Sequence, residues 1–326
     1  MTTVRSLYEQ YRPLIRSRVS AGTARGYESA WRRRVEPSFG DAPVEGLRTL
    51  DVELAFASWS GSLSTRVDAL SVLSSICKTA IKAGLIASNP CIGVERPRTQ
   101  DADPTSRALS MEEVDRLFGL LPRSGPYRRF VLAMLYTGCR LGEVAALRVS
   151  DVDWSSRTIT IRRSAAAGLH GELVVGPTKG RRVRSVPLAA PLVPIVQEAA
   201  AGKGPHELLF PGPRGGHLTS KNLSRALGWA RARTAVKDFP PDEEALHWHD
   251  LRHTAAVVLF QAGVSAPDVQ AILGHSSLAV TQMYANTRND AAKRGTTALS
   301  AYWGSQSVGH LEGGDSTAKK GADLGI

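Results

Sequence analysis

Four side chains that could act together on a phosphate lie near the C-terminal end of the chain. His249 and Arg252 are three residues apart, so on a helix they share one face and can bind the same target. Gly274 follows an apolar-periodic run and predicts a helix end immediately before His275. Tyr284 follows, and its phenol is a potential nucleophile. Such a set suits an anion that is attacked by a tyrosine, and a phosphodiester in DNA is the candidate substrate.

These residues lie in short motifs that resemble a known family. HDLRHT at His249–Thr254, LGHSS at Leu273–Ser277 and the later Met283-Tyr284 resemble the second half of the catalytic signature of tyrosine recombinases, the phage-integrase family. The first half of that signature, Thr-Gly-x-Arg-x-x-Glu, is found at Thr137–Glu143. Each piece alone is a weak pattern, but their order and spacing together are highly specific.

The resemblance implies a role for each side chain in a DNA strand transfer. Arg140 and Arg252 would bind the non-bridging phosphate oxygens through planar, permanently charged guanidinium groups. Tyr284 would form a 3′-phosphotyrosyl intermediate, which conserves the phosphodiester energy and needs no ATP. His249 would act as general base toward the phenol. His275 would donate a hydrogen bond to a non-bridging oxygen.

Two further residues complete the set that the resemblance implies. Lys179 would protonate the leaving 5′ oxygen, although Lys203 and Lys221 are alternatives for this role. Glu143 would orient the arginines and histidines from behind. Neither a carboxylate cluster with metal-ligand spacing nor a Gly-rich phosphate loop accompanies these residues, so we expect no metal and no cofactor.

The charge balance favours a polyanionic partner, here double-stranded DNA. Lys and Arg number 41 against 30 Asp and Glu, which gives a net charge of +11. The three cysteines show neither metal-ligand spacing nor a disulfide framework. We see no signal-peptide core, and no apolar run approaches the length of a membrane span. We therefore expect a cytoplasmic protein of a bacterial host, with no membrane association.

The chain divides into segments of different composition. Residues 1–95 are expected to form a helical core-type DNA-binding domain, and residues 96–107, which are polar and contain two prolines, read as a linker. Residues 108–305 would form the catalytic domain, and residues 306–326 a disordered tail. The fold class is mainly α with a small antiparallel β-sheet (α+β).

Helical periodicity predicts four helices in the N-terminal part. They cover residues 1–20, where Pro13 would limit the helix start, a segment capped by Thr23, Asp51–Trp59 and Thr65–Leu85. A triple arginine lies on the second of them. Thr219 would cap a basic helix further along the chain. The arginines that we expect to contact DNA are Arg32, Arg33, Arg34, Arg225 and Arg231.

A short sheet is expected in the first half of the catalytic segment. Thr158–Ile161, Leu173–Val175 and Val183–Leu188 are three apolar runs of strand length. Pro177–Gly180, which carries Lys179, would be the hairpin turn between the last two runs. Before the sheet, local signals predict a helix that opens with a capping box, a buried helix that ends at a glycine, and the helix that bears the signature glutamate.

Several functions remain open at this level. The preferred one is the integrase of a phage or another mobile element; the alternatives are a Xer-like dimer resolvase and a DNA-binding regulator without catalytic activity. A type IB topoisomerase shares the chemistry but resembles this chain less. The family implies a homotetramer on two duplexes, with Ala291–Trp303 as the candidate segment for docking on a neighbouring subunit. No additional arm-binding domain is expected before the first helices.

Overall fold

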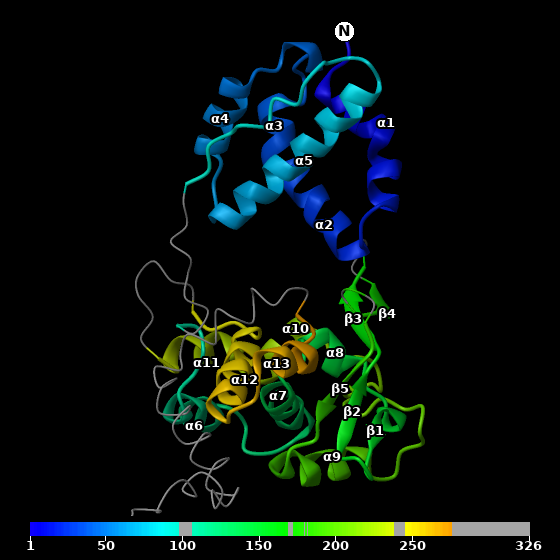
Figure 1. Cartoon of the computed structure of the whole chain (residues 1–326), viewed down its shortest axis with the longest axis vertical. Helices are drawn as coiled ribbons and strands as arrows, with labels where there is room; N and C mark the ends of the chain where they lie inside the picture. Colours follow the sequence, from blue (N-terminus) through cyan, green and yellow to red (C-terminus); the bar gives the residue numbers. More distant parts are fainter. Residues whose placement is uncertain (98–105, 169–171, 179, 181, 238–244, 276–326) are drawn as a thin grey trace, which may run out of the picture.

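Helices dominate the structure, and two small antiparallel sheets accompany them, in agreement with the expected fold class. The computed structural model describes residues 1–97, 106–168, 172–178, 180, 182–237 and 245–275. Figure 1 shows the N-terminal helices at one end of the long axis, and the remaining helices with the sheets at the other. The two groups contact each other where β3 (Arg163–Ala167) packs against α2 (Ala21–Ala30).

The N-terminal group contains α-helices, a π-helical turn and a 3-10 turn. They are α1 (Val4–Ser17), α2, η1 (Trp31–Val35), α3 (Glu36–Phe39), η2 (Val44–Gly46), α4 (Thr49–Ser58) and α5 (Leu63–Lys82). The four predicted helices are present, and the second continues through η1 into α3. Tyr8 stacks on Trp31 with ring centroids 4.0 Å apart, so α1 is fixed against the turn that carries the triple arginine.

Two N-terminal details differ from the sequence prediction. Pro13 lies inside α1 and does not limit its start. Burial of Leu7 and Ile15 on one face of the helix outweighs the hydrogen bond that proline cannot donate. The second helix is capped by Ser20, whose hydroxyl accepts a hydrogen bond from the backbone of Thr23. The predicted cap residue is therefore already inside the helix.

The larger group contains the remaining helices. They are α6 (Met111–Leu120), α7 (Pro126–Thr137), α8 (Leu141–Ala145), η3 (Val149–Asp151), η4 (Ala190–Leu192), α9 (Val193–Ala200), α10 (Ser220–Ala226), α11 (Trp229–Ala235), α12 (Asp250–Gln261) and α13 (Ala266–Leu273). The capping box that opens α6 is confirmed, because Ser110 and Glu113 exchange side chain–backbone hydrogen bonds. The predicted helix end at Gly138 and the end at Gly274 are confirmed as well.

The strand pairing differs from the prediction. Strands β1 (Val152–Asp153), β2 (Thr158–Ile161) and β5 (Arg184–Pro187) form one antiparallel sheet in the order β1-β2-β5. Strand β4 (Leu173–Pro177) pairs with β3 in a separate two-stranded sheet. The expected hairpin between the last two runs is therefore wrong. β3 and β4 form a local hairpin, but the alanine-rich β3 carries no strand signal of its own, so the sequence did not predict it.

The predicted basic helix is two helices. Gly228 adopts a left-handed conformation with φ +61° and separates α10 from α11. Thr219 caps α10 as predicted, by accepting a hydrogen bond from Asn222. Arg225 consequently lies on α10 and Arg231 on α11.

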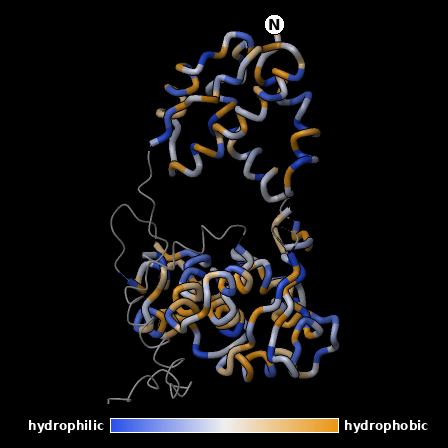
Figure 2. The backbone as a smooth tube through the Cα atoms, in the orientation of Figure 1, coloured by the Kyte–Doolittle hydropathy of each residue, from blue (hydrophilic) through white to orange (hydrophobic). Residues whose placement is uncertain are grey.

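Each of the two groups has a hydrophobic core of its own. One core contains buried residues between Val4 and Val94, and another contains residues between Leu109 and Leu251. Figure 2 shows hydrophobic and hydrophilic residues in alternation along the helices of both groups, as amphipathic helices require. None of the helices described here is long and apolar enough to cross a membrane. The boundaries at residues 1–95 and 108–305 stay a prediction.

Candidate active site

The guanidinium of Arg252 is the most deeply buried cation of the site. The residue is 2% exposed, and α12 carries it. Its Nη1 donates to the carbonyl of Gly138 at 2.9 Å, and its Nη2 donates to the carbonyl of Leu273 at 2.7 Å. Within the described part of the chain, Nε has no hydrogen-bond partner. Since buried donors are normally satisfied, this N–H is open to an acceptor that the described residues do not supply.

Close approach of three helices makes this arrangement possible. Gly138 ends α7 in a left-handed conformation with φ +64°. A Cβ at this position would lie 2.5 Å from Leu273 Cδ2 and 3.1 Å from Ala255 Cβ. Only glycine therefore fits where α7 meets α12 and α13, and its carbonyl reaches Arg252 for that reason.

Arg140 and Glu143 share the first turn of α8. The Glu143 carboxylate accepts from the Arg140 backbone N–H at 2.9 Å and from Arg140 Nη1 at 3.1 Å. The side chain of Glu143 is 1% exposed, whereas that of Arg140 is 28% exposed. The buried Glu143 thus caps the N-terminus of α8, and Arg140 keeps part of its guanidinium open to solvent.

Arg184 belongs to the same cluster, although the sequence motifs did not single it out. Its Nη1 and Nη2 donate to the two carboxylate oxygens of Glu143 at 3.1 and 2.7 Å, and its Nε donates to the carbonyl of Ile272 at 2.8 Å. Its inward position on β5, in phase with the buried Val186, is a signal that could have found it. A basic residue on the inner face of an apolar strand requires buried partners.

The two predicted histidines flank this cluster. His249 is the N-cap of α12 and follows Trp248, whose ring stacks on Trp229 at 3.6 Å. The His249 side chain is exposed at the rim of the site, yet surrounding protein and neighbouring cations lower its pKa to about 4. Half-buried His275 follows Gly274, and burial together with the charges of Arg252 and its neighbours lowers the pKa of His275 to about 4.

The cluster carries an uncompensated positive charge. Arg140, Arg184 and Arg252 contribute three positive charges against the single negative charge of Glu143, and the histidines are neutral at pH 7. Burial and the charge of Arg140 lower the pKa of Arg252 to about 10. Although burial favours its neutral form, hydrogen bonds from Arg184 hold the pKa of Glu143 below its ordinary value. A fixed excess of two positive charges favours the binding of an anion here.

Two predicted residues, Lys179 and Tyr284, lie outside the described residues, as does Ala291–Trp303. The segment that would carry Lys179 connects β4 and β5, which belong to different sheets, so it is not a hairpin turn. Beside that position, Thr178 is buried and its hydroxyl donates to the carbonyl of Arg182 at 2.7 Å. Among the described residues, no group of His, Cys, Asp and Glu could hold a metal ion.

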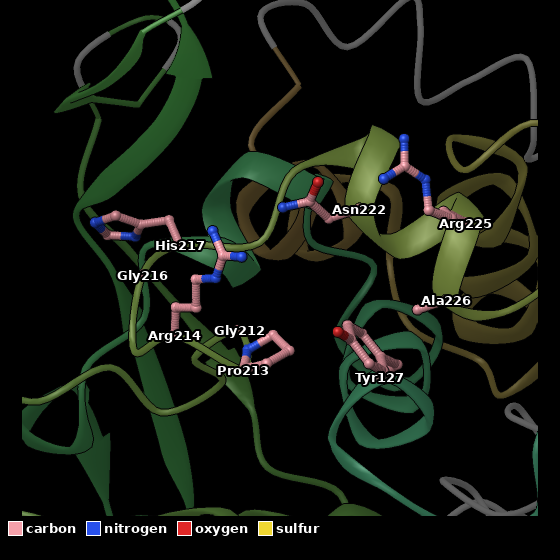
Figure 3. A pocket seen from close by; sticks show the side chains of 9 residues that line it. All are labelled: Tyr127, Gly212, Pro213, Arg214, Gly216, His217, Asn222, Arg225 and Ala226. Atoms are coloured by element: carbon pink, nitrogen blue, oxygen red, sulfur yellow. The ribbon is translucent and has the colours of Figure 1, made fainter.

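A second cationic region lies beside α10. A cavity of about 420 Å³ opens there, and Figure 3 shows Arg214 and His217 on one side of it, with Asn222 and Arg225 on α10. His217 Nδ1 lies 2.8 Å from the carbonyl of Ala145. Because a carbonyl only accepts hydrogen bonds, Nδ1 carries a proton and donates it to this carbonyl. With the amide of Asn222, the site offers both donors and acceptors beside the exposed Arg225.

The other predicted DNA-binding arginines differ in their surroundings. Arg32 forms an ion pair with Glu28 at 3.2 Å and remains 69% exposed. Arg33 is exposed, whereas Arg34 donates to the carbonyl of Ser60 at 2.9 and 2.6 Å. Arg231 is exposed on α11.

The sequence of this chain is similar to that of known proteins. A profile described as the phage integrase family matches residues 107–290. This chain belongs to that family. The integrase of Mycobacterium phage D29 is 30% identical over 275 residues, which are 82% of this chain and 70% of that protein. The tyrosine recombinase XerC of Oceanobacillus iheyensis is 30% identical over 234 residues, which are 68% of this chain and 69% of that protein.

Solved structures show the same fold. A structure of the Tn1549 transposon integrase in complex with a circular intermediate DNA has a TM-score of 0.71 at 20% identity, over 92% of this chain and 100% of that chain. A lambda integrase tetramer bound to a Holliday junction has a TM-score of 0.65 at 20% identity, over 85% and 78% of the two chains. The present chain is therefore a tyrosine-type site-specific recombinase.

Proposed function

We propose that this recombinase is an integrase that cleaves and rejoins DNA through a 3′-phosphotyrosyl intermediate on Tyr284. The phenolic oxygen attacks the scissile phosphorus, the bond from phosphorus to the 5′ oxygen breaks, and the phenolic proton leaves. The 5′ oxygen takes up a proton and becomes a hydroxyl. Attack of that hydroxyl, or of one from another duplex, reverses the step, so the reaction needs no ATP.

The buried charge of the site is the observation that carries this proposal. Attack on a phosphodiester adds a second negative charge to the phosphoryl oxygens, and the cluster of Arg140, Arg184, Arg252 and Glu143 has two excess positive charges. The orphan Nε of Arg252 supplies a donor for one of those oxygens. Preorganised donors of this kind stabilise a transition state without rearranging.

The remaining roles follow from position and protonation. His249 is neutral at pH 7 and can accept the phenolic proton as general base. His275 donates to a non-bridging oxygen through a ring N–H, and Lys179 is the proposed general acid for the 5′ oxygen. Glu143 is the proposed supporting residue, since it holds Arg140 by backbone and side chain. These residues perform the chemistry without a metal ion.

The proposed substrate is a core-type attachment site on double-stranded DNA. The cavity that contains Arg214, His217 and Asn222 next to Arg225 supports contact with a duplex, because it combines phosphate-binding cations with groups able to read base edges. Arg231 and the N-terminal Arg32 and Arg33 would add phosphate contacts. Arg34, which holds a backbone carbonyl, would act mainly within the protein.

We propose a homotetramer on two duplexes in the bacterial cytoplasm, with Ala291–Trp303 docked on a neighbouring subunit. The lambda integrase tetramer on a Holliday junction supports this assembly. Integration is favoured over dimer resolution because the solved neighbours are integrases of a transposon and a phage. XerC-type relatives at similar identity make a Xer-like resolvase the second candidate.

The experiment is covalent trapping on a nicked suicide substrate in the presence of EDTA. The substrate carries a candidate core site, and adducts are detected by denaturing electrophoresis. The expected result is an adduct with the wild-type protein and none with Tyr284→Phe, which retains DNA binding in a gel shift. An adduct that persists in Tyr284→Phe would overturn the choice of nucleophile. Loss of the wild-type adduct in EDTA would overturn the metal-free mechanism.

A further inference from the structure

Arg184 connects three segments that are far apart in the chain. It lies on β5, bonds both oxygens of Glu143 on α8, and bonds the carbonyl of Ile272 near the end of α13. Its Nη2 also lies 3.8 Å from Sγ of Cys139, the residue that precedes Arg140 in the chain. The side chain is only 8% exposed. A buried guanidinium with this many acceptors constrains all three segments at once.

The stem of Arg184 also determines where the chain leaves α13. Gly274 has φ +69°, and a Cβ there would lie 3.0 Å from Arg184 Cδ and 3.1 Å from Arg184 Nε. The left-handed turn before His275 is therefore packed directly on the arginine stem. A shift of Arg184 would move this turn, and the imidazole that follows it.

Strand formation does not require an arginine at this position. An apolar side chain in phase with Val186 would extend the core, whereas a guanidinium must be desolvated and then matched by buried acceptors. Each segment that Arg184 binds contributes a residue to the proposed chemistry: Arg140 beside α8 and His275 after α13. Lys179 belongs to the connection that leads from β4 into β5, and β5 is the strand that carries Arg184.

We propose that Arg184 is a positioning residue that holds Arg140 and His275 in register with β5. It acts through Glu143 and through the turn at Gly274, and it does not contact the DNA. This inference rests on the proposed function, since the residues that it positions are the proposed catalytic ones.

The test compares Arg184→Met with the matched control Arg182→Met, an exposed arginine on the same segment. Single-turnover cleavage of the suicide substrate is measured at saturating protein, together with DNA affinity and thermal stability. We expect cleavage by Arg184→Met to fall roughly 100-fold, because misplacement by about 1 Å has such an effect. DNA affinity should change less than cleavage, and Arg182→Met should cleave as the wild type does. Arg184→Lys should recover part of the rate.

The pH profile separates positioning from general structural damage. Without Arg184, burial is expected to raise the pKa of Glu143, so cleavage by Arg184→Met should fall further as the pH decreases. In Arg184→Met with Glu143→Gln, that additional acid limb should be absent. A pH profile of Arg184→Met that parallels the wild type would overturn the proposed action through Glu143.

A measurement on the free protein keeps this inference distinct from the proposed function. The imidazole of His275 is followed by NMR, with His275→Asn to assign its signal. Because Arg184→Met also removes a positive charge close to the Gly274 turn, displacement is read from the NOE contacts of the His275 ring and not from its pKa. An unchanged His275 with wild-type cleavage would overturn the positioning role. If Arg184→Met displaces His275 but the wild-type protein forms no Tyr284 adduct, only the proposed function is overturned.

Discussion

In each of the two groups of elements, one cluster sets three arginines beside a single glutamate. In the N-terminal group, Glu28 lies 3.6 Å from Arg12, 2.7 Å from Arg16 and 3.2 Å from Arg32. Tyr8 donates its hydroxyl to the same carboxylate at 3.1 Å. The arginine side chains are 31% to 69% exposed. Solvent screens their charges, so each ion pair contributes little to stability.

The cluster of Arg140, Arg184, Arg252 and Glu143 has the same composition but a different environment. Arg184 and Arg252 are nearly inaccessible to solvent, and backbone carbonyls hold both of them. Burial lowers the pKa of Arg252 to about 10, although the group stays charged at pH 7. The geometry is thus fixed before any ligand arrives.

Burial, and not the number of charges, distinguishes the proposed catalytic anion site from the proposed DNA-binding surface of the N-terminal group. Exposed arginines attract phosphate from a distance and release counterions when they bind it. Buried arginines cannot rearrange, so they suit one arrangement of oxygens at one moment of the reaction. Variants in the two clusters should therefore have different effects.

The largest effect is expected at Arg252. Arg252→Gln removes the guanidinium from a buried site, and we expect single-turnover cleavage to fall on the order of 10³-fold, as loss of an oxyanion donor does. Arg252→Lys should fail by at least about 10²-fold, because one ammonium cannot hold the carbonyls of Gly138 and Leu273 and also reach the phosphate. Cleavage by Arg252→Lys near the wild-type rate would show that charge alone suffices.

An intermediate effect concerns protons. The pKa of His275 is about 4 in the free protein, and a phosphodiester beside the ring favours its charged form. DNA binding should therefore raise this pKa, and the affinity should increase as the pH falls from 7 to 5. Calorimetry at pH 6 in buffers with different ionisation enthalpies should detect an uptake of up to about one proton per protomer.

Two histidine variants give this titration its controls. His275→Asn should reduce the proton uptake. His206→Asn, at an exposed histidine in the loop after α9, should leave it unchanged. If DNA affinity does not depend on pH between 5 and 7, the phosphate does not lie beside His275.

The smallest effect is expected in the N-terminal cluster. Arg32→Gln should lower the dependence of DNA affinity on the logarithm of salt concentration by about one unit, with the stability changed by less than roughly 1 kcal/mol. Arg34→Gln, which loses the bonds to the carbonyl of Ser60, should lower the melting temperature and leave the salt dependence nearly unchanged. Equal salt dependence in the two variants would contradict the distinction between them.

Local signals in the sequence were sufficient for several parts of the fold. Ser110 with Glu113, and the glycines Gly138 and Gly274, predicted helix ends correctly because each signal and its consequence lie within one turn of chain. The pairing of β4 with β3 is a local hairpin, and it was missed because the alanine-rich β3 has little strand propensity. The helix break at Gly228 was missed because an isolated glycine is also tolerated inside a helix.

By itself, the sequence determined which chemical groups are present and in what order: an arginine in the Thr137–Glu143 motif, the pair His249 and Arg252, and His275 after a helix end. Only the tertiary structure decided that Arg184 joins them and that the charge is buried. The physical reason is that spacing along a helix is fixed by its 3.6-residue period. Desolvation and strand pairing depend instead on which distant segments pack together.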